Sequence, residues 1–252
     1  MDSFISWIGG KKLLRKAITE RFPESESYDR YIEVFGGAGW VLFSKDLHAK
    51  CEIFNDIDSN LVNLYRCLKY HREALEKELQ YTVHSREVFM DCKQQLNMSG
   101  LTDIQRAARY FILIRSSFGS DRKSFKTATS CIVDKIGDFP KVQERLSRVV
   151  IENKDFEGLI KVYDRPSALF YLDPPYHTTE KYYNCDFGEK DHIRLRDCLQ
   201  QIKGKFILSY NNDEFIKDLY KEYNIEEISR NNNLSINRGT GREFKELIIK
   251  NY

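Results

Sequence analysis

Several features are scarce in this sequence, and each scarcity excludes a class of protein. The six cysteines form no Cys-x-x-Cys pair, so neither a zinc site nor a redox dithiol is expected. Single scattered cysteines are typical of a reducing compartment. No apolar run approaches the roughly 18 residues that a membrane-spanning helix needs, and the N-terminus lacks a secretory pattern. We therefore expect a soluble, cytoplasmic protein.

The chain also lacks a strong charge of either sign. It has 40 basic and 38 acidic residues, for a formal net charge of +2. Overall charge therefore does not predict a nucleic-acid partner, and only local clusters can. The 252 residues are 41% hydrophobic and include 16 Phe and 15 Tyr, which is enough to form a folded core and excludes a disordered chain. Repeats and low-complexity tracts are absent.

Short apolar runs alternate with amphipathic stretches at both ends of the chain. The pattern predicts strands at 31–35, 51–55, 149–152, 169–172, 206–210, 225–229 and 244–250. It predicts helices at 11–22, 40–49, 59–70, 156–163, 190–201 and 213–222. Strands that alternate with helices in this way are typical of an α/β protein with a doubly wound, mostly parallel sheet.

The middle of the chain does not follow that alternation. Residues 72–79, 86–97 and 103–115 have helical patterns, and residues 116–130 are polar, basic and rich in Ser and Thr. We interpret residues 71–147 as an inserted, mostly helical sub-domain with one exposed hairpin or loop. Residues 1–70 and 148–252 would then form one catalytic domain around it.

A glycine-rich segment, Glu-Val-Phe-Gly-Gly-Ala-Gly at 33–39, follows the first predicted strand. Glycines at a strand end let the backbone turn tightly and approach a ligand closely. Asp56 directly follows the next predicted strand, and a carboxylate at that place can accept hydrogen bonds from ribose hydroxyls. The segment therefore predicts a nucleoside-bearing cofactor. Leu42 stands where a nicotinamide-binding fingerprint would have its last glycine, which argues against that cofactor.

A second motif, Asp173-Pro174-Pro175-Tyr176, follows the apolar predicted strand 169–172. The carboxyl ends of parallel strands are where open α/β sheets bind ligands. An exocyclic aromatic amine is a poor nucleophile because its lone pair is delocalised into the ring. The Asp173 carboxylate and the Pro174 carbonyl can both accept hydrogen bonds from such an amine, and Tyr176 can stack on the base.

These motifs together resemble the Dam-type (D12 class) family of DNA adenine-N6 methyltransferases. In that family the glycine motif comes first, an inserted target-recognition region follows, and Asp-Pro-Pro-Tyr comes last. Trp7-Ile8-Gly9-Gly10-Lys11 resembles the family's Trp-x-Gly-Gly-Lys segment, and residues 115–119 resemble its Arg-x-Ser-Phe-Asn-Gly stretch. No Asn precedes Gly119 here, so the chain departs from the family pattern at that point.

The resemblance implies a Rossmann-like fold and S-adenosylmethionine (AdoMet) as methyl donor, with no metal. It implies that Asp173, Pro174 and Tyr176 hold the target adenine. It implies that the AdoMet site is lined by Trp7, Lys11, Phe35, Gly37, Asp56, Ile57, Asp155 and Phe156. It also implies a bacterial or phage-encoded enzyme.

Two local clusters predict contacts to duplex DNA. Between residues 104 and 126 there are six basic side chains and one acidic one, and residues 230–242 hold basic and amide side chains without an acid. Such clusters can contact phosphates, and Arg and Asn can read base edges. The residues expected to contact DNA are Arg115, Ser117, Arg122, Lys123, Lys126 and Arg238.

The expected reaction is direct methyl transfer to a flipped adenine. Cytosine-C5 methylation would need an activated cysteine, usually after a proline, and no cysteine here follows a proline. Several alternatives stay open: methylation of cytosine N4, RNA adenine or protein glutamine, or a catalytically inactive DNA-binding relative. The target sequence, the oligomeric state and a cognate restriction endonuclease are likewise left open by the sequence.

Overall fold

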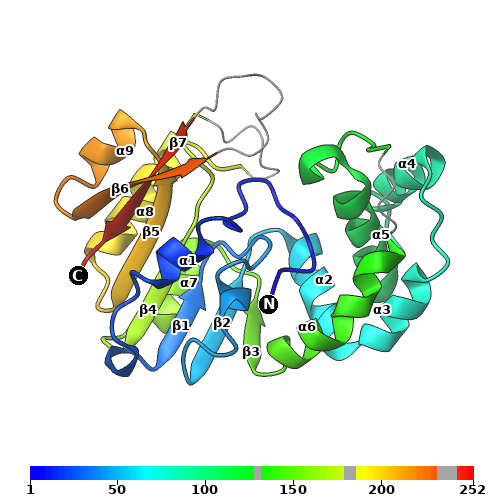
Figure 1. The fold of residues 1–252 in the computed structure, drawn as a ribbon, viewed down its shortest axis with the longest axis horizontal. Helices are drawn as coiled ribbons and strands as arrows, with labels where there is room; N and C mark the ends of the chain where they lie inside the picture. The colour runs from blue at the N-terminus through cyan, green and yellow to red at the C-terminus, as the bar shows by residue number, and fades with distance from the viewer. Residues whose placement is uncertain (128–131, 179–185, 232–242) are drawn as a thin grey trace.

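The described strands form one seven-stranded sheet in the order β3-β2-β1-β4-β5-β7-β6 (Figure 1). The computed structural model describes residues 1–127, 132–178, 186–231 and 243–252. The strands are β1 (Arg30–Glu33), β2 (Cys51–Asn55), β3 (Val149–Glu152), β4 (Ala168–Leu172), β5 (Lys205–Asn211), β6 (Asn224–Asn231) and β7 (Glu243–Lys250).

The sheet is parallel from β3 to β5, and β7 runs antiparallel to both β5 and β6. The chain winds outward from β1 to β2 and β3 and then, from β4, outward to β5 in the other direction. Strand order therefore reverses between β1 and β4, which is the place where a doubly wound sheet leaves a crevice for ligands. The expected doubly wound, Rossmann-like fold is confirmed.

Alternating side chains of the strands pack on two faces, as the period of a β-strand requires. Ile32 and Phe170 belong to the core beneath α7 (Phe156–Tyr163), α8 (Glu189–Gln200) and α9 (Glu214–Leu219), whereas Tyr31 and Tyr171 belong to the core on the opposite face. β4 is buried along its whole length, which explains its uninterrupted apolar sequence.

A group of helices packs beside the β3 edge of the sheet (Figure 1). It comprises α2 (Ser59–Tyr70), α3 (Arg72–Leu79), α4 (Arg86–Gln95), α5 (Asp103–Ser116), α6 (Phe139–Leu146) and the 3-10 segment η4 (Val133–Asp138). The helices predicted at 59–70, 72–79, 86–97 and 103–115 are thus confirmed to within two residues. Their starts follow from capping: Asp58 accepts the N–H groups of Asn60 and Leu61 at α2, and Thr102 forms a capping box at α5.

The insert shares one hydrophobic core with the sheet. Phe4, from the N-terminal segment, contacts Tyr65 of α2, Phe111 of α5 and Phe139 of α6, with ring centroids 5.2, 6.5 and 6.1 Å away. Buried residues of β1 and β2 belong to the same core. Residues of the segment 71–147 are therefore packed onto the sheet, and the division into two domains stays a prediction. None of the described helices is both long and apolar enough to cross a membrane.

Two predicted helices are largely wrong. Segment 40–49 contains only the 3-10 turn η2 (Leu42–Ser44), and segment 11–22 contains only the short α1 (Arg15–Thr19). Residues 40–43 are all buried, which leaves no polar face for a surface helix. The guanidinium of Arg145, from α6, donates to the carbonyls of Leu42 and Lys45, so distant side chains satisfy this backbone in place of helical hydrogen bonds. The remaining 3-10 turns are η1 (Ser25–Ser27) and η3 (Phe118–Ser120).

Candidate active site

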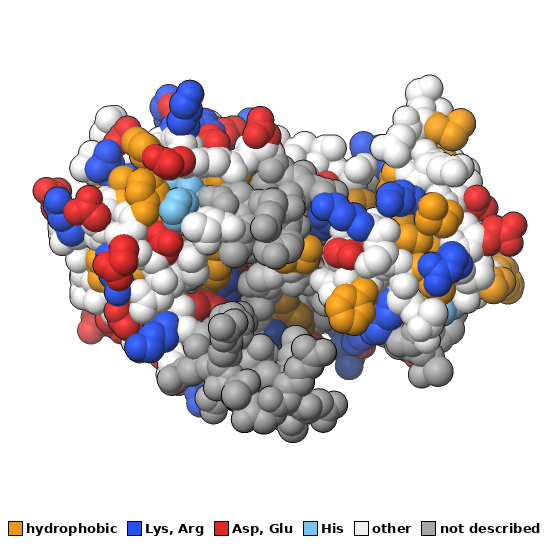
Figure 2. All heavy atoms as spheres, turned by 90° about the horizontal axis from the view of Figure 1, so that it is seen from above, with side chains coloured by type: hydrophobic (Ala, Val, Ile, Leu, Met, Phe, Trp, Pro, Cys, Tyr) orange, Lys and Arg blue, Asp and Glu red, His pale blue; other side chains and the backbone are white. Residues whose placement is uncertain are grey.

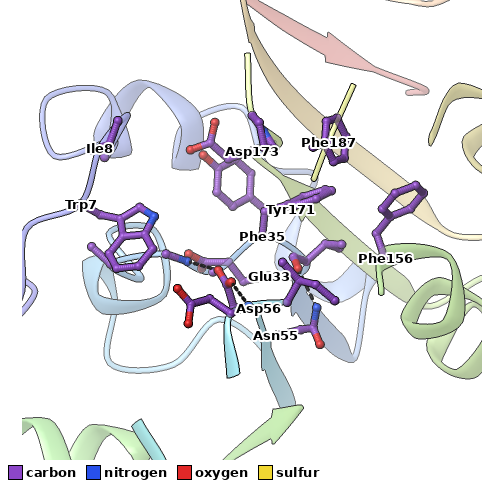
Figure 3. A pocket seen from close by; sticks show the side chains of 18 of the residues that line it. Trp7, Ile8, Glu33, Phe35, Asn55, Asp56, Phe156, Tyr171, Asp173 and Phe187 are labelled. Carbon is purple, nitrogen blue, oxygen red and sulfur yellow. Dashed lines mark hydrogen bonds between the residues drawn. The ribbon is translucent and has the colours of Figure 1, made fainter. Parts of the chain in front are cut away.

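A cavity of about 330 Å³ lies at the carboxyl ends of β1, β2 and β4. All eight residues expected to bind the cofactor line it, and so does Asp173. Figure 3 shows Trp7 on one side of the cavity, Phe156 and Phe187 on the other, and Asp56 and Asn55 below. A cavity of this size suits a small-molecule ligand. The structure therefore brings together residues that lie as far apart in sequence as Trp7 and Asp173.

The glycine turn after β1 forms one wall. Gly37 has a φ of +48°, a conformation that favours glycine, and a Cβ there would lie 2.9 Å from Cδ1 of Trp7. The neighbouring Gly36 leaves room for the ring of Phe54, which a Cβ would approach to 2.3 Å. Glycine is thus required here both for the turn and for close packing against Trp7.

The Asp56 carboxylate, just after β2, holds that turn in place. One oxygen accepts the Gly37 N–H at 2.9 Å and the other accepts the Asp58 N–H at 2.8 Å. Burial raises the pKa of Asp56 to about 6, although these two backbone N–H groups oppose the shift. Each oxygen keeps a lone pair for a ligand hydroxyl.

Asp173 follows β4 and is held from two sides. Lys11 donates to its carboxylate from 2.6 and 2.7 Å, and Ser209 of β5 donates from 2.9 Å. The Lys11 ammonium is almost fully buried and also donates to the carbonyl of Gly9. Burial raises the pKa of Asp173, and the Lys11 ammonium opposes that shift. Ser209 was not anticipated from the sequence, because only strand pairing brings it near Asp173.

Tyr176 and Pro174 are not among the residues that line the cavity. Pro174 is buried, and Pro175 is the proline that lines the cavity. The Tyr176 hydroxyl donates to the Glu246 carboxylate of β7 at 2.7 Å, and the Lys11 ammonium lies 4.6 Å from the centre of its ring. One face of the ring therefore packs against a cation in this structure, whereas the sequence predicted that it stacks on a base.

The far wall combines an aromatic cluster with an ion pair. The rings of Phe35, Phe156 and Phe187 lie within about 6 Å of one another. Asp155 caps α7 and receives two hydrogen bonds of 2.9 Å from Arg194 of α8, whose guanidinium also lies 4.2 Å from the Phe156 ring. Arg194 had no signal in the sequence, since an exposed helix commonly carries arginines.

Glu33 is a second residue of the cavity that the sequence motifs did not indicate. It closes the floor of the cavity, is fully buried, and accepts a hydrogen bond of 2.7 Å from the Tyr31 hydroxyl. Burial raises its pKa to about 8, so the side chain is largely protonated at neutral pH. The sequence feature that could have indicated Glu33 is its position as the last residue of β1, directly before the glycine turn.

The residues expected to contact DNA occupy different environments. Lys123 is exposed and Lys126 half-buried, but Ser117 is buried and its hydroxyl accepts the Arg122 N–H. Burial lowers the pKa of Arg115, which faces the carboxylates of Asp134 and Asp138. Ser117 is thus engaged within its own loop and Arg115 is half-buried, and contacts from these two residues to DNA stay a prediction.

Arg122 is the clearest departure from expectation: it lines the cavity with 7% of its surface exposed. Arg238 lies outside the described residues. The predicted hairpin exists in short form, as an antiparallel bridge between Ser117 and Phe125. Figure 2 shows acidic, basic and hydrophobic side chains interspersed on the face seen from above. In the described part of the chain, no group of three or more His, Cys, Asp or Glu residues could hold a metal ion.

Comparison with known proteins identifies the family. The chain is 29% identical over 275 residues to the type II methyltransferase M1.LlaDCHI of Lactococcus lactis, and the match covers 99% of this chain and 95% of that relative. It is 24% identical to the type II methyltransferase M.CviBI of Paramecium bursaria Chlorella virus NC1A over the full length of both. A DNA adenine methylase of Haemophilus influenzae is 22% identical, with 97% and 92% of the two chains covered.

The family model for the D12 class N6 adenine-specific DNA methyltransferases matches residues 7–234, which span the glycine turn, the helical insert and the Asp173 loop. The chain belongs to this family and is an AdoMet-dependent enzyme that methylates the N6 amino group of adenine in DNA.

Proposed function

We propose that AdoMet binds in the cavity between Trp7 and Phe156, and that Asp173 presents the adenine N6 amino group to it. The observation that carries this proposal is that Asp173 opens into the same cavity as the glycine turn and Asp56. A methyl donor in one part of this cavity and an amine at Asp173 are neighbours, so the reaction needs little beyond their relative placement.

The lining of the cavity supports AdoMet as the ligand. Its described lining holds six acidic and four basic side chains, and Glu33 is largely neutral because burial raises its pKa to about 8. The remaining excess of one acidic group complements AdoMet, which carries a net positive charge. Asp56 would accept the ribose hydroxyls, and the rings of Phe35 and Phe156 would pack on the adenine of the cofactor.

Asp173 and the carbonyl of Pro174 would accept the two N–H groups of the target amine, after the base has left the DNA stack. Asp173 must be ionised to do so. Ser209 keeps one carboxylate oxygen in place from β5, so the carboxylate enters the reaction already oriented. AdoMet, when bound, would supply a methyl group on a positively charged sulfur; the N6 nitrogen would bond to this methyl as the bond between methyl and sulfur breaks, and would then lose one proton.

Lys11 would balance the charge of Asp173 while the amine is absent. Its ammonium contacts both the carboxylate and one face of the Tyr176 ring, so a base that stacks on that face would displace it. The Lys11 ammonium also donates to the Gly9 carbonyl, 2.9 Å away. Glu246 fixes the ring plane of Tyr176 through the 2.7 Å hydrogen bond to its hydroxyl, which prepares the ring for stacking on the adenine.

We further propose that the protein modifies a specific site in double-stranded DNA as the methylating partner of a restriction endonuclease. Two relatives that align along nearly all of this chain are named type II methyltransferases. The exposed Lys123 on the short hairpin of the insert supports a contact to the DNA backbone.

The test is methyl transfer from tritiated AdoMet to unmethylated duplex DNA, followed by digestion and identification of the labelled nucleoside. Label in N6-methyl-2′-deoxyadenosine that Asp173→Asn abolishes supports the site. Asp197→Asn is the matched control, since Asp197 is a half-exposed carboxylate on α8 and its loss should leave the rate unchanged. Label in N4-methyl-2′-deoxycytidine, or an active Asp173→Asn variant, would contradict the proposed assignment.

A further inference from the structure

Arg122 lies on the loop expected to read DNA but points into the cofactor cavity. Only 7% of its surface is exposed, and it is one of the residues lining the cavity. Its guanidinium lies 4.3 Å from the centre of the Trp7 ring and 5.7 Å from that of Tyr110. Trp7 in turn packs directly over the Gly37 turn. Arg122 therefore covers the residue that forms one wall of the cavity.

The backbone of this loop is held in an unfavourable conformation that directs Arg122 inward. Ser120 and Arg122 have φ values of 63° and 58°, a left-handed conformation that is unfavourable for residues other than glycine and persists only where surrounding contacts hold it. Two contacts hold it here. The Ser117 hydroxyl accepts the Arg122 N–H at 3.0 Å, and the hydroxyls of Ser6 and Ser120 lie 2.5 Å apart. The loop is thereby tied to the segment that carries Trp7.

The charge of Arg122 is balanced, but its hydrogen-bonding capacity is not used up. The carboxylate of Asp56 lies close enough to interact electrostatically with the guanidinium. Asp56 itself is bonded to backbone N–H groups, and Asp58 accepts the Tyr110 hydroxyl. Within the part of the chain that the structure describes, the buried Nε of Arg122 has no hydrogen-bond partner. A buried donor left unsatisfied is destabilising, so a ligand oxygen that accepts this N–H would bind favourably.

We propose that Arg122 is a cofactor-binding residue, which clamps Trp7 over the glycine turn and donates its Nε–H to a carboxylate or hydroxyl oxygen of AdoMet. The proposal rests on AdoMet occupying the cavity. It replaces the phosphate contact expected from the sequence. Because Arg122 belongs to the loop 117–125, occupancy of the cofactor site then also fixes the conformation of the loop that faces DNA.

The first measurement is the affinity for AdoMet without DNA, by titration calorimetry. Arg122→Ala should weaken binding about tenfold to hundredfold, which corresponds to the loss of one charge-assisted hydrogen bond. Arg122→Lys keeps a cation near Trp7 but has no donor at the Nε position, so its affinity should fall while its melting temperature stays near that of the unmodified protein. The matched control is Lys123→Ala, the exposed neighbour, which should bind AdoMet normally.

The second measurement separates the two roles of Arg122. DNA binding without AdoMet is measured over a range of salt concentrations. The plot of log K against log salt has a negative slope, and each lost phosphate contact makes that slope less steep by about 0.9. The proposal predicts an unchanged slope for Arg122→Ala. A slope lowered by that amount together with normal AdoMet affinity would overturn it, as would normal AdoMet affinity in Arg122→Lys. Failure of the unmodified protein to bind AdoMet would instead overturn the function proposed for the cavity.

Discussion

Removal of the Lys11 ammonium tests how the protein tolerates the buried Asp173 carboxylate in its active site. The two groups are 2.6 Å apart, and their side chains are 3% and 18% exposed. Breaking a buried ion pair by removing one partner costs about 3–5 kcal/mol, because the other charge is left in a poorly solvated site. For Lys11→Met we expect the lower end, about 3 kcal/mol at pH 8, since Asp173 retains Ser209 and some contact with solvent.

The loss of stability in Lys11→Met should become smaller as the pH falls. Burial raises the pKa of Asp173 in the folded protein, and Lys11 opposes that shift. Without Lys11 the folded pKa rises further above that of the unfolded chain. The folded variant then binds a proton as the pH falls, so its deficit should shrink between pH 8 and pH 5. The free energy of unfolding, measured in urea at both pH values, checks this.

A double-mutant cycle isolates the interaction between the two groups. Lys11→Met combined with Asp173→Asn removes both charges and should recover most of the loss, so that the two single effects are not additive. The matched control is Lys12→Met, because Lys12 pairs with Asp2 at the surface, where both side chains are about half exposed, and its loss should change stability by less than about 0.5 kcal/mol. Additive effects, or an equal deficit at pH 5 and pH 8, would refute the reasoning.

Three further predictions concern the glycine turn, the cavity floor and the hairpin. Gly37→Ala places a methyl group 2.9 Å from Trp7 at a φ of +48°, so AdoMet affinity should fall at least tenfold in a binding titration; an unchanged affinity would show that Trp7 is free to move. Burial raises the pKa of Glu33 from 4.5 to about 8, so the stability that its protonated form contributes is complete below about pH 4.5 and is lost as the pH rises to about 8. Glu33→Gln should therefore flatten the plot of melting temperature against pH in this range. An unaltered slope would argue that Glu33 is ionised in the folded protein. Lys123→Ala with Lys126→Ala should lower the slope of log K for DNA against log salt by about 1 to 2, and an unaffected slope would exclude phosphate contacts from the hairpin.

The local sequence was sufficient to predict an element where a single strong local pattern determines its bounds. The strand Cys51–Asn55 and the helix Ser59–Tyr70 lie where they were expected, because a buried apolar run ends at Asp56 and Asp58 then caps the helix. The glycine turn and the Asp173 loop were predictable for the same reason. Each stands at the end of a strand, and the carboxyl ends of parallel strands meet at one edge of the sheet.

What the sequence could not supply is the environment of charged side chains. Arg122 and Lys123 are neighbours with the same charge, yet one is buried in the cavity and the other is exposed. The difference arises from the inward-turned backbone at Arg122 and from Trp7, more than a hundred residues earlier. The helix predicted at 40–49 is absent for a similar reason, because the side chain of Arg145 donates hydrogen bonds to two of the carbonyls of this segment. Burial and partners of this kind are fixed by tertiary contacts, which composition and periodicity do not encode.

The shared core limits how the insert can respond to DNA. Phe4 packs against Phe111 in the middle of α5, and the Tyr110 hydroxyl donates to Asp58 at the start of α2, so α5 is fixed to the catalytic part near the cavity. Rotation of the whole insert would separate these buried contacts and expose aromatic surface, at a cost of about 25 cal/mol for each Å². Adjustment to DNA is therefore expected in the loop that follows α5, where the Ser6 hydroxyl and the Trp7 ring tie Ser120 and Arg122 to the N-terminal segment. Loss of these contacts would release the loop, and the same contacts help to form the wall of the cofactor site.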